Sequence, residues 1–559
     1  MNDAVPSLIL TNGNILTLDG KSRVVHAVAI DNDRIVALGS SGEIGALAGP
    51  GTKVLDLGGR TAMPGLIDGH AHMDREGLKE ALPSLAGIRS IATLRERIAE
   101  LAARTPKGEW IVTMPLGDPP EYEIGPRGFA EGRFPNRLDL DEAAPDHPVY
   151  IKPAWGYWRV GMPSVAIANS RALDLAGIGR DTQPPAGSVA VDRDAAGQPT
   201  GILFDDNRMP ILDFTLMRAA PSFDLAARVA ALPRSMQIYN SFGTTSVYEG
   251  HGVARDVVEA YRRVRAARKQ TVRATLSFSP AWGGVSADAI PAMVADWAKW
   301  LARSGTGDHW IRENGLYAEV DTSLENEIRR SVYPETGWAG FNYAGLPREA
   351  VKVLLRECAR NGVRVTGITA PTLELFAEAS REFPIQGQRW VMAHITALND
   401  DQIAQMRDLG IVATTHTNGY IWKSGSSFRD RIGREREDDI VPLRRLRDAG
   451  VPVSFGTDNV PVSLWYPIWQ TVARLDRKTQ TQIAPGQALT REEALRCATR
   501  GGAWLTFEEK DKGSLEPGKL ADIVVLSQNP LTCELDRLRH TVAEIAIVGG
   551  RIVYERDKA

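Results

Sequence analysis

The stretch PREAVKVLLRECARNGVRVTGIT, residues 347–369, contains the order of elements from which the fold can be predicted. Its first part has apolar residues at helical spacing, Asn361-Gly362 is typical of a helix end, and VRVTGIT is an apolar run of strand length. Two later stretches repeat this order: DDQIAQMRDLGIVATTH (400–416) with Gly410, and IVPLRRLRDAGVPVSFGTD (440–458) with Gly450. Such units predict a parallel α/β sheet covered by helices. Periodicity fits an open sheet as well, but the length favours a (β/α)8 TIM barrel.

Both ends of the chain contain short β-rich runs that are broken by turn residues. SLILTNGNILTLDG and AVAIDNDRIVALG lie near the start, and ADIVVLSQNP and EIAIVGGRIVYE lie within residues 521–555. Neither end has enough strands for a core of its own, so we expect them to pair. The prediction is a composite β-sandwich domain of residues 1–62 plus 511–559, with the barrel over 63–510. Within the barrel, Thr490 and Glu493 of LTREEAL predict a capping box.

Residues from about 78 to 230 do not follow the helix–glycine–strand order. They include the charged helical pattern ATLRERIAELAAR and loop-rich stretches such as PLGDPPEYEIGPRGF and PAWGYWRVGMP. We interpret this segment as a large insertion over the barrel mouth, where substrate specificity most naturally resides.

The composition is that of an ordinary globular protein and restricts the kind of partner. In 559 residues, 43% are hydrophobic and 24% charged, and the formal net charge is -3, which gives no reason to expect nucleic acid or an anionic membrane. The three cysteines have no CxxC spacing, so neither a disulfide framework nor a thiolate zinc site is indicated. No apolar run has the length of a membrane helix and no signal peptide is evident. We expect a cytoplasmic protein with a small-molecule substrate, and a homo-oligomer is compatible with the sequence.

GLIDGHAHMD, residues 65–74, places two of the nine histidines of the chain one residue apart. On a strand, side chains at i and i+2 point to the same face, roughly 6–7 Å apart. His70 and His72 could therefore bind one metal ion, or they could be two buried, hydrogen-bonded histidines without a metal.

Further polar residues follow apolar runs at the predicted strand ends, where the chemistry of a barrel is located. They are Glu249 and His251 in SVYEGH, Glu319 and Asp321 in GLYAEVD, Thr366, His394, His416 and Asp458. Taken singly, His394 or His416 could be a satisfied core histidine, and Asp458 could cap a turn. Taken together, the residues predict a site of nitrogen and oxygen donors suited to a divalent metal, with Zn²⁺ favoured and Fe or Mn as alternatives.

Several motifs together resemble the amidohydrolase superfamily. They are PGLIDGHAH, the AH pair at His394, GTDNVP, LTREEAL and the C-terminal GSLEPGKLADIVVL with VGGRIVYE. The closer likeness is to the N-substituted formamide deformylase-like branch (amidohydrolase 3), and it covers nearly the whole chain. The resemblance implies a β-sandwich beside a metal-dependent TIM barrel. It also implies that His70, His72 and His394 are ligands, that Asp458 is a ligand or the general base, and that metal-bound hydroxide attacks an amide-like carbon.

The sequence departs from the family pattern at two places. Thr366 in VTGITA stands where a strand-five histidine is usual, and Tyr317 stands where many members have a carboxylated lysine that bridges two metals. We therefore predict one ion per chain, held by His70, His72, His394 and Asp458. Further candidates for metal or substrate contacts are His416, Glu249, His251, Glu319, Tyr317 and Trp155.

The function predicted from these residues is hydrolysis of a carbon–nitrogen bond, amide or formamide-like, by metal-activated water. Asp458 would take a proton from the water and return one to the leaving nitrogen. One alternative keeps the site but hydrolyses an ester, lactone or C–C bond of an aromatic compound. Another is a barrel that has lost catalysis and serves as a scaffold.

Overall fold

The centre of the molecule is a parallel barrel of eight strands. The structure is a computed structural model that describes residues 5–119, 121–154, 163–207, 211–331, 345–368 and 370–558. The barrel strands, in the order in which they pair, are β8 (Leu66–Ala71), β14 (Thr244–Val253), β15 (Arg273–Phe278), β17 (Ile311–Tyr317), β18 (Val365–Gly367), β19 (Val391–Met392), β20 (Val412–Thr415) and β21 (Val453–Phe455). A two-residue strand, β16 (Thr306–Gly307), adds to β17. Between β21 and β8, the last and first strands in this order, the Asp458 N–H donates to the His70 carbonyl at 2.9 Å. The predicted fold class is confirmed.

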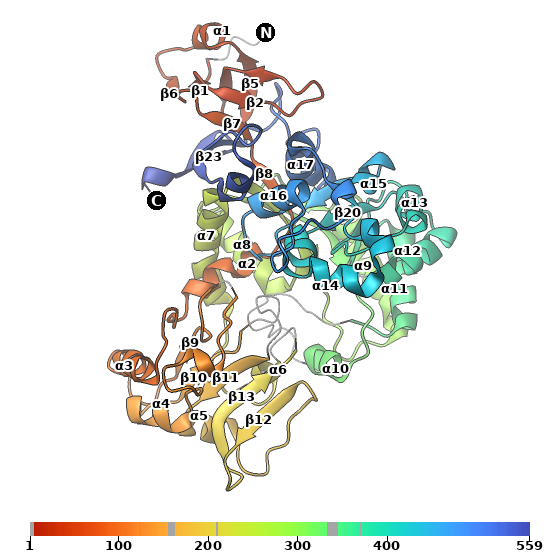
Figure 1. Cartoon of the computed structure of the whole chain (residues 1–559). Helices are drawn as coiled ribbons and strands as arrows, with labels where there is room; N and C mark the ends of the chain where they lie inside the picture. Colours follow the sequence, from red (N-terminus) through yellow and green to blue (C-terminus); the bar gives the residue numbers. More distant parts are fainter. Residues whose placement is uncertain are drawn as a thin grey trace.

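Helices between the strands form the outer layer of the barrel (Figure 1). They include α7 (Leu225–Ser241), α8 (Arg255–Ala266), α9 (Ile290–Leu301), α11 (Arg348–Asn361), α12 (Ala370–Glu382), α13 (Asp400–Leu409), α15 (Leu443–Asp448), α16 (Trp465–Ala473) and α17 (Arg491–Arg496). Gly362 and Gly410 cap α11 and α13 at φ of 68° and 67°, the left-handed region that glycine adopts without strain. The predicted capping box of Thr490 and Glu493 begins α17.

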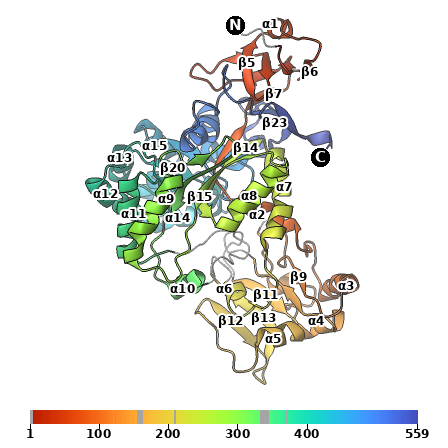
Figure 2. The ribbon, with the colours of Figure 1, turned by 180° about the vertical axis from the view of Figure 1, so that it is seen from behind.

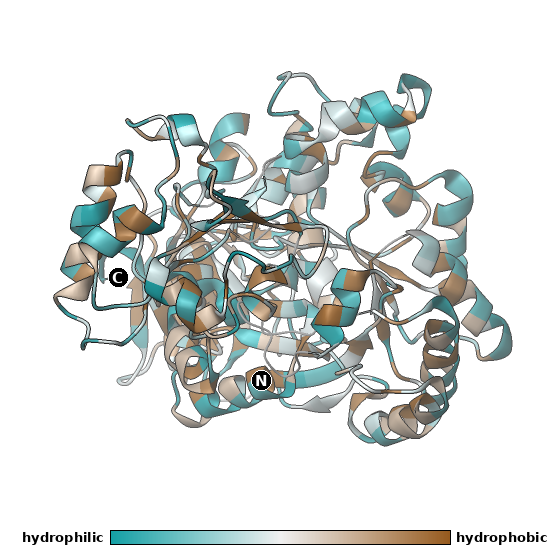
Figure 3. Cartoon of the chain, turned by 90° about the horizontal axis from the view of Figure 1, so that it is seen from below, coloured by the Kyte–Doolittle hydropathy of each residue, from teal (hydrophilic) through white to brown (hydrophobic). Residues whose placement is uncertain are grey.

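Apolar side chains of the strands and helices form the largest core. The helices carry hydrophilic and hydrophobic stretches in alternation (Figure 3), as expected when one face of a helix is buried. Trp390, Trp465 and Trp469 are fully buried there, and the Trp390 ring packs edge-on against Phe376 at 4.8 Å. Across the described ranges, none of the helices combines the length and the apolar character needed to span a membrane.

Strands from both ends of the chain lie together at one end of the barrel (Figure 1). The first sheet has the order β5-β4-β1-β6 and the second β24-β23-β22-β7-β2-β3. Their bounds are β1 (Leu8–Thr11), β2 (Asn14–Leu16), β3 (Val24–Val25), β4 (Ala27–Asp31), β5 (Arg34–Gly39), β6 (Lys53–Asp56), β7 (Thr61–Pro64), β22 (Ile523–Leu526), β23 (Ala543–Val548) and β24 (Arg551–Glu555). β7 pairs antiparallel with β22, and apolar residues of both sheets share one core. The two ends therefore build one sandwich.

A separate five-stranded sheet lies at the opposite end of the barrel (Figures 1 and 2). Its order is β12-β13-β11-β10-β9. It consists of β9 (Ile111–Thr113), β10 (Val149–Ile151), β11 (Ser164–Ala168), β12 (Val189–Arg193) and β13 (Pro199–Asp205), and α3 (Ile91–Ala102), α4 (Arg137–Ala143) and α5 (Ser170–Ala176) flank it. This sheet lies within the segment predicted as an insertion over the barrel mouth. The exact domain boundaries remain predictions.

Candidate metal centre

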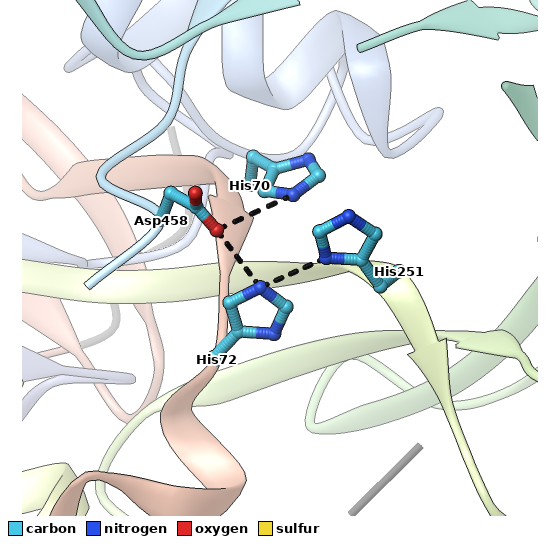
Figure 4. Close-up of side chains that lie close together, drawn as sticks. All are labelled: His70, His72, His251 and Asp458. Carbon is cyan, nitrogen blue, oxygen red and sulfur yellow. Dashed lines mark hydrogen bonds and ion pairs between the residues drawn. The ribbon is translucent and has the colours of Figure 1, made fainter. Parts of the chain in front are cut away.

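Five histidines and one aspartate converge at the carboxyl ends of the barrel strands. His70 lies in β8 and His72 just after it, His251 lies in β14, His394 and His416 follow β19 and β20, and Asp458 follows β21. All six side chains are buried. Figure 4 shows His70, His72, His251 and Asp458 pointing toward one another. The four ligands predicted from the sequence are thus brought together, and two further candidates, His251 and His416, join them.

The donor atoms form two overlapping groups that share Asp458. In the first group, the His72 Nε2 atom lies 2.9 Å and the His70 Nε2 atom 3.8 Å from Asp458 Oδ1, and His251 Nδ1 lies 3.0 Å from His72 Nε2. In the second group, His416 Nε2 and His394 Nε2 lie 3.5 and 3.9 Å from Asp458 Oδ2. The His70 and His394 Nε2 atoms are 3.1 Å apart, so the two groups are in contact.

The protonation chemistry of this cluster suits a cation. Burial lowers the pKa of His70, His72 and His251 well below the usual histidine value, which keeps these imidazoles neutral, the form that binds metals. Burial acts to raise the pKa of Asp458, but the neighbouring His416, His394 and His70 bring it below the usual value. The cluster therefore presents neutral nitrogen donors around one carboxylate.

Several buried nitrogen and oxygen atoms of the cluster make no hydrogen bond with any described residue. They are Nδ1 of His70, both ring nitrogens of His416 and Oδ2 of Asp458. A buried polar atom without a partner costs free energy, so such atoms are rare in folded proteins unless a ligand satisfies them. Neutral imidazoles and a carboxylate are the donor set that Zn²⁺ prefers, and the residues present fit a divalent ion.

Glycines allow the strands to approach closely enough for this arrangement. A Cβ atom at Gly250 would lie 2.1 Å from His70 Nδ1, and one at Gly456 would lie 2.4 Å from His70 Cβ. In β14 the register shifts between Glu249 and Val253, and Gly252 has a φ of 76°. A regular strand would place Glu249 and His251 on the same face. Because of this irregularity, His251 points into the centre while Glu249 contacts the backbone of Met73 and Asp74.

Two buried side chains outside the donor set connect the ends of β8 and β21. Asp68 accepts from the His70 N–H at 3.1 Å, the Thr457 N–H at 3.0 Å and the Thr457 hydroxyl at 2.5 Å. Asn459 donates to the His72 carbonyl at 2.8 Å and accepts from the His72 N–H at 3.0 Å. These bonds fix the backbone on both sides of His70, His72 and Asp458.

The remaining predicted contacts lie beside the cluster. Glu249 accepts from the Met73 and Asp74 N–H groups at 3.1 and 3.2 Å and so fixes the turn after His72. The Tyr317 ring lies edge-on to His251 at 5.4 Å, and its hydroxyl donates to Glu319 at 2.8 Å. Trp155 lies outside the described residues.

Thr366 takes the strand-five place without supplying a nitrogen donor. It shares a hydrogen bond of 2.7 Å with the Tyr248 hydroxyl, and both residues are buried. Asp68 and Asn459 are not among the residues predicted from the sequence, although an aspartate inside the apolar run GLIDG is a usable signal.

The profile of the Amidohydrolase family matches residues 53–554 of this sequence. The chain belongs to this family. Among curated proteins, the amidohydrolase resembles the N-substituted formamide deformylase of Arthrobacter pascens, at 27% identity over 98% of both chains. It also resembles the putative amidohydrolase YtcJ of Bacillus subtilis, at 24% identity over 98% of this chain and 99% of the relative.

Solved structures show the same fold. An uncharacterized metal-dependent hydrolase from Pyrococcus furiosus aligns with a TM-score of 0.67 at 20% identity, covering 94% of this chain and all of that one. The predicted relationship to the amidohydrolase 3 branch is confirmed, and the protein is a divergent member of it. As an amidohydrolase it is a hydrolase of carbon–nitrogen bonds that uses a divalent metal.

Proposed function

We propose that this amidohydrolase cleaves the carbon–nitrogen bond of a small amide or formamide-like compound. The observation that carries the proposal is the convergence of five buried histidines and Asp458 at the barrel mouth, with donor atoms that lack hydrogen-bond partners among the described residues. The relative from Arthrobacter pascens, a formamide deformylase by name, supports this substrate class. A scaffold without catalysis does not require neutral imidazoles around a buried carboxylate, and burying such polar atoms costs free energy.

His70, His72, His394 and Asp458 would hold the ion, with His251 and His416 close enough to complete its coordination. When bound, a divalent ion supplies Lewis-acid activation of water and of the amide carbonyl. Zn²⁺ suits the nitrogen and oxygen donors best, and Fe²⁺ and Mn²⁺ are the alternatives.

Asp458 is the proposed general base, because its two oxygens have different surroundings. Oδ1 lies 2.9 Å from His72, whereas Oδ2 has no hydrogen-bond partner among the described residues and faces His416 and His394. An oxygen in this setting is available to accept a proton from water and to return it to the leaving nitrogen. Burial excludes bulk water from the competition for that proton.

We propose one ion per chain. The His70 and His394 nitrogens are 3.1 Å apart, so donors of both groups can serve one position, and Tyr317 cannot be carboxylated as a bridging lysine can. Mass spectrometry of the metal content after zinc loading and desalting should give a zinc-to-chain ratio near one. A ratio near two, with both ions resistant to dialysis, would contradict this.

A substrate screen tests the function. The zinc-, iron- and manganese-loaded proteins are assayed against N-formyl amines, N-acyl amines, esters and lactones of matched size, with product analysis by mass spectrometry. We expect release of an amine from at least one amide or formamide. Turnover confined to esters or lactones would favour the alternative reaction at the same site. A purified protein that retains no ion would favour the scaffold.

A further inference from the structure

Lys423 is a half-buried lysine whose ammonium group has no hydrogen-bond or ion-pair partner among the described residues. Among the described residues, the other lysines that are not exposed each form an ion pair: Lys79 with Glu76 at 2.8 Å, Lys152 with Asp213 at 2.8 Å, Lys352 with Glu349 at 3.3 Å, Lys512 with Glu508 at 2.6 Å and Lys519 with Glu516 at 3.2 Å. Lys423 forms neither a hydrogen bond nor an ion pair with any described residue. A charge taken partly out of water without a partner is unfavourable, so an unpaired ammonium calls for an explanation.

The place of Lys423 in the fold relates it to the metal centre. It is the last residue of the π-helical segment η4 (Asn418–Lys423), which begins two residues after His416. This segment packs directly on the cluster: a Cβ at Gly419 would lie 2.8 Å from the His416 ring, and the Tyr420 ring lies 4.7 Å from it. π-helical turns are rare overall, and those that occur are frequently located at functional sites.

Lys423 interacts electrostatically with His416 and Asp458 of the metal centre. Burial lowers the pKa of His416, and the charge of Lys423 lowers it further against the opposing effect of Asp458. Burial also lowers the pKa of Lys423, and Asp458 is among the carboxylates that act against this lowering. The other carboxylates that act on this pKa are Glu121 and Glu123 from the insertion, and neither forms an ion pair with the ammonium. The three donors of the ammonium are therefore not taken up by any described residue.

We propose that Lys423 binds a carboxylate of the substrate and that the substrate is an amide bearing an acidic group, of the N-acyl amino acid class. This inference rests on the proposed function and specifies its substrate. The amide would lie at the histidine cluster, and the carboxylate would accept from Lys423 in a charge-assisted hydrogen bond. Lysine recognises an anion as a point charge, so the interaction sets charge preference rather than a fixed geometry.

The experiment compares matched compounds that differ only in charge. A panel of N-formyl and N-acetyl amino acids of both hands, with side chains from methyl to benzyl, is paired with the corresponding N-acyl amino alcohols. With the zinc-loaded full chain, we expect KM to be lower for the preferred acid than for its alcohol. Lys423→Met should raise KM for the acid by about 10- to 100-fold, leave kcat within about threefold, and leave KM for the alcohol nearly unchanged.

Two control variants accompany the test. Lys423→Arg keeps the charge and should retain most of the preference, whereas Lys478→Met removes an exposed lysine and should change neither constant. An equal rise of KM for acid and alcohol in Lys423→Met would overturn the proposal, and so would a wild type that does not prefer any acid over its alcohol.

If no compound of the panel is hydrolysed, the proposed function fails for this substrate class. Calorimetric titration of the same pairs then tests the recognition alone, since no turnover disturbs the measurement. Tighter binding of an acid than of its alcohol by the wild type, lost in Lys423→Met, would support the role of Lys423. The absence of any such difference across the panel would overturn it.

Discussion

His70 and His72 stand side by side at the end of β8, and both rings point into the cluster at the barrel mouth. If both bind the ion, replacing either by Ala removes a ligand and should strip the metal and abolish turnover. The fold should survive, since the surrounding strands pair through their backbones. Metal analysis and circular dichroism of each variant test this, with the exposed His540→Ala as the control that keeps its metal. Full metal occupancy in both variants would disprove the assignment.

Asp458 can be distinguished as base, ligand or turn cap by one substitution. Asn keeps the size and one oxygen but cannot accept a proton at neutral pH, so as the base Asp458→Asn should retain metal while kcat falls about 10²–10⁴-fold. As an ordinary ligand, the variant should lose metal and recover rate when metal is added. As a turn cap, it should lose about 1 kcal/mol of stability and little activity. Metal content and kcat are measured on one preparation, with and without added zinc. Near-normal kcat in the loaded variant would remove Asp458 from the mechanism.

The joint between β8 and β21 closes the barrel beside the metal centre. Asp68 receives three hydrogen bonds there, two of them from Thr457. Asp68→Ala leaves buried donors unsatisfied and should lower the free energy of unfolding by about 1–3 kcal/mol. The same variant should weaken zinc binding, because His70 and Asp458 lose their common support. Denaturant unfolding and zinc titration test both effects, and Asp288→Ala, an exposed carboxylate, is the control. Unchanged zinc affinity would show that Asp68 does not position the ligands.

The elements themselves were predictable to different degrees. The units around Gly362 and Gly410 were recognisable because a helix, a left-handed cap and an apolar strand are all local features. The contribution of His251 depends on the shifted register of β14 and on the close approach of Gly250 to the His70 ring, neither of which a single sequence shows. Whether Lys423 pairs with a carboxylate depends on the tertiary structure, and among the described residues no carboxylate of the insertion forms an ion pair with it.

A buried ion pair connects the barrel with the sandwich built from both chain ends. Arg273 of β15 contacts Asp522, one residue before β22, through two bonds of 2.7 and 2.9 Å, and the side chains are 2% and 5% exposed. Asp522 also accepts from the Gly549 N–H at 2.9 Å, so the pair fixes the turn of the β23–β24 hairpin against the barrel. Removing one partner leaves the other charge buried and unpaired, which is far costlier than losing both.

Arg273→Leu or Asp522→Leu alone should therefore destabilise the chain by about 3–5 kcal/mol, and the double variant should lose less than the sum of the two. Thermal unfolding of the four proteins gives the coupling between the residues. The matched control is the pair of Lys299 and Asp296, whose charged atoms lie 2.8 Å apart but whose side chains are 75% and 67% exposed, and its removal should cost about 0–1 kcal/mol. Limited proteolysis should release the sandwich sooner in the single variants than in the wild type. Additive losses, or losses no larger than those of the exposed pair, would mean that apolar packing holds the two parts together and that the ion pair does not.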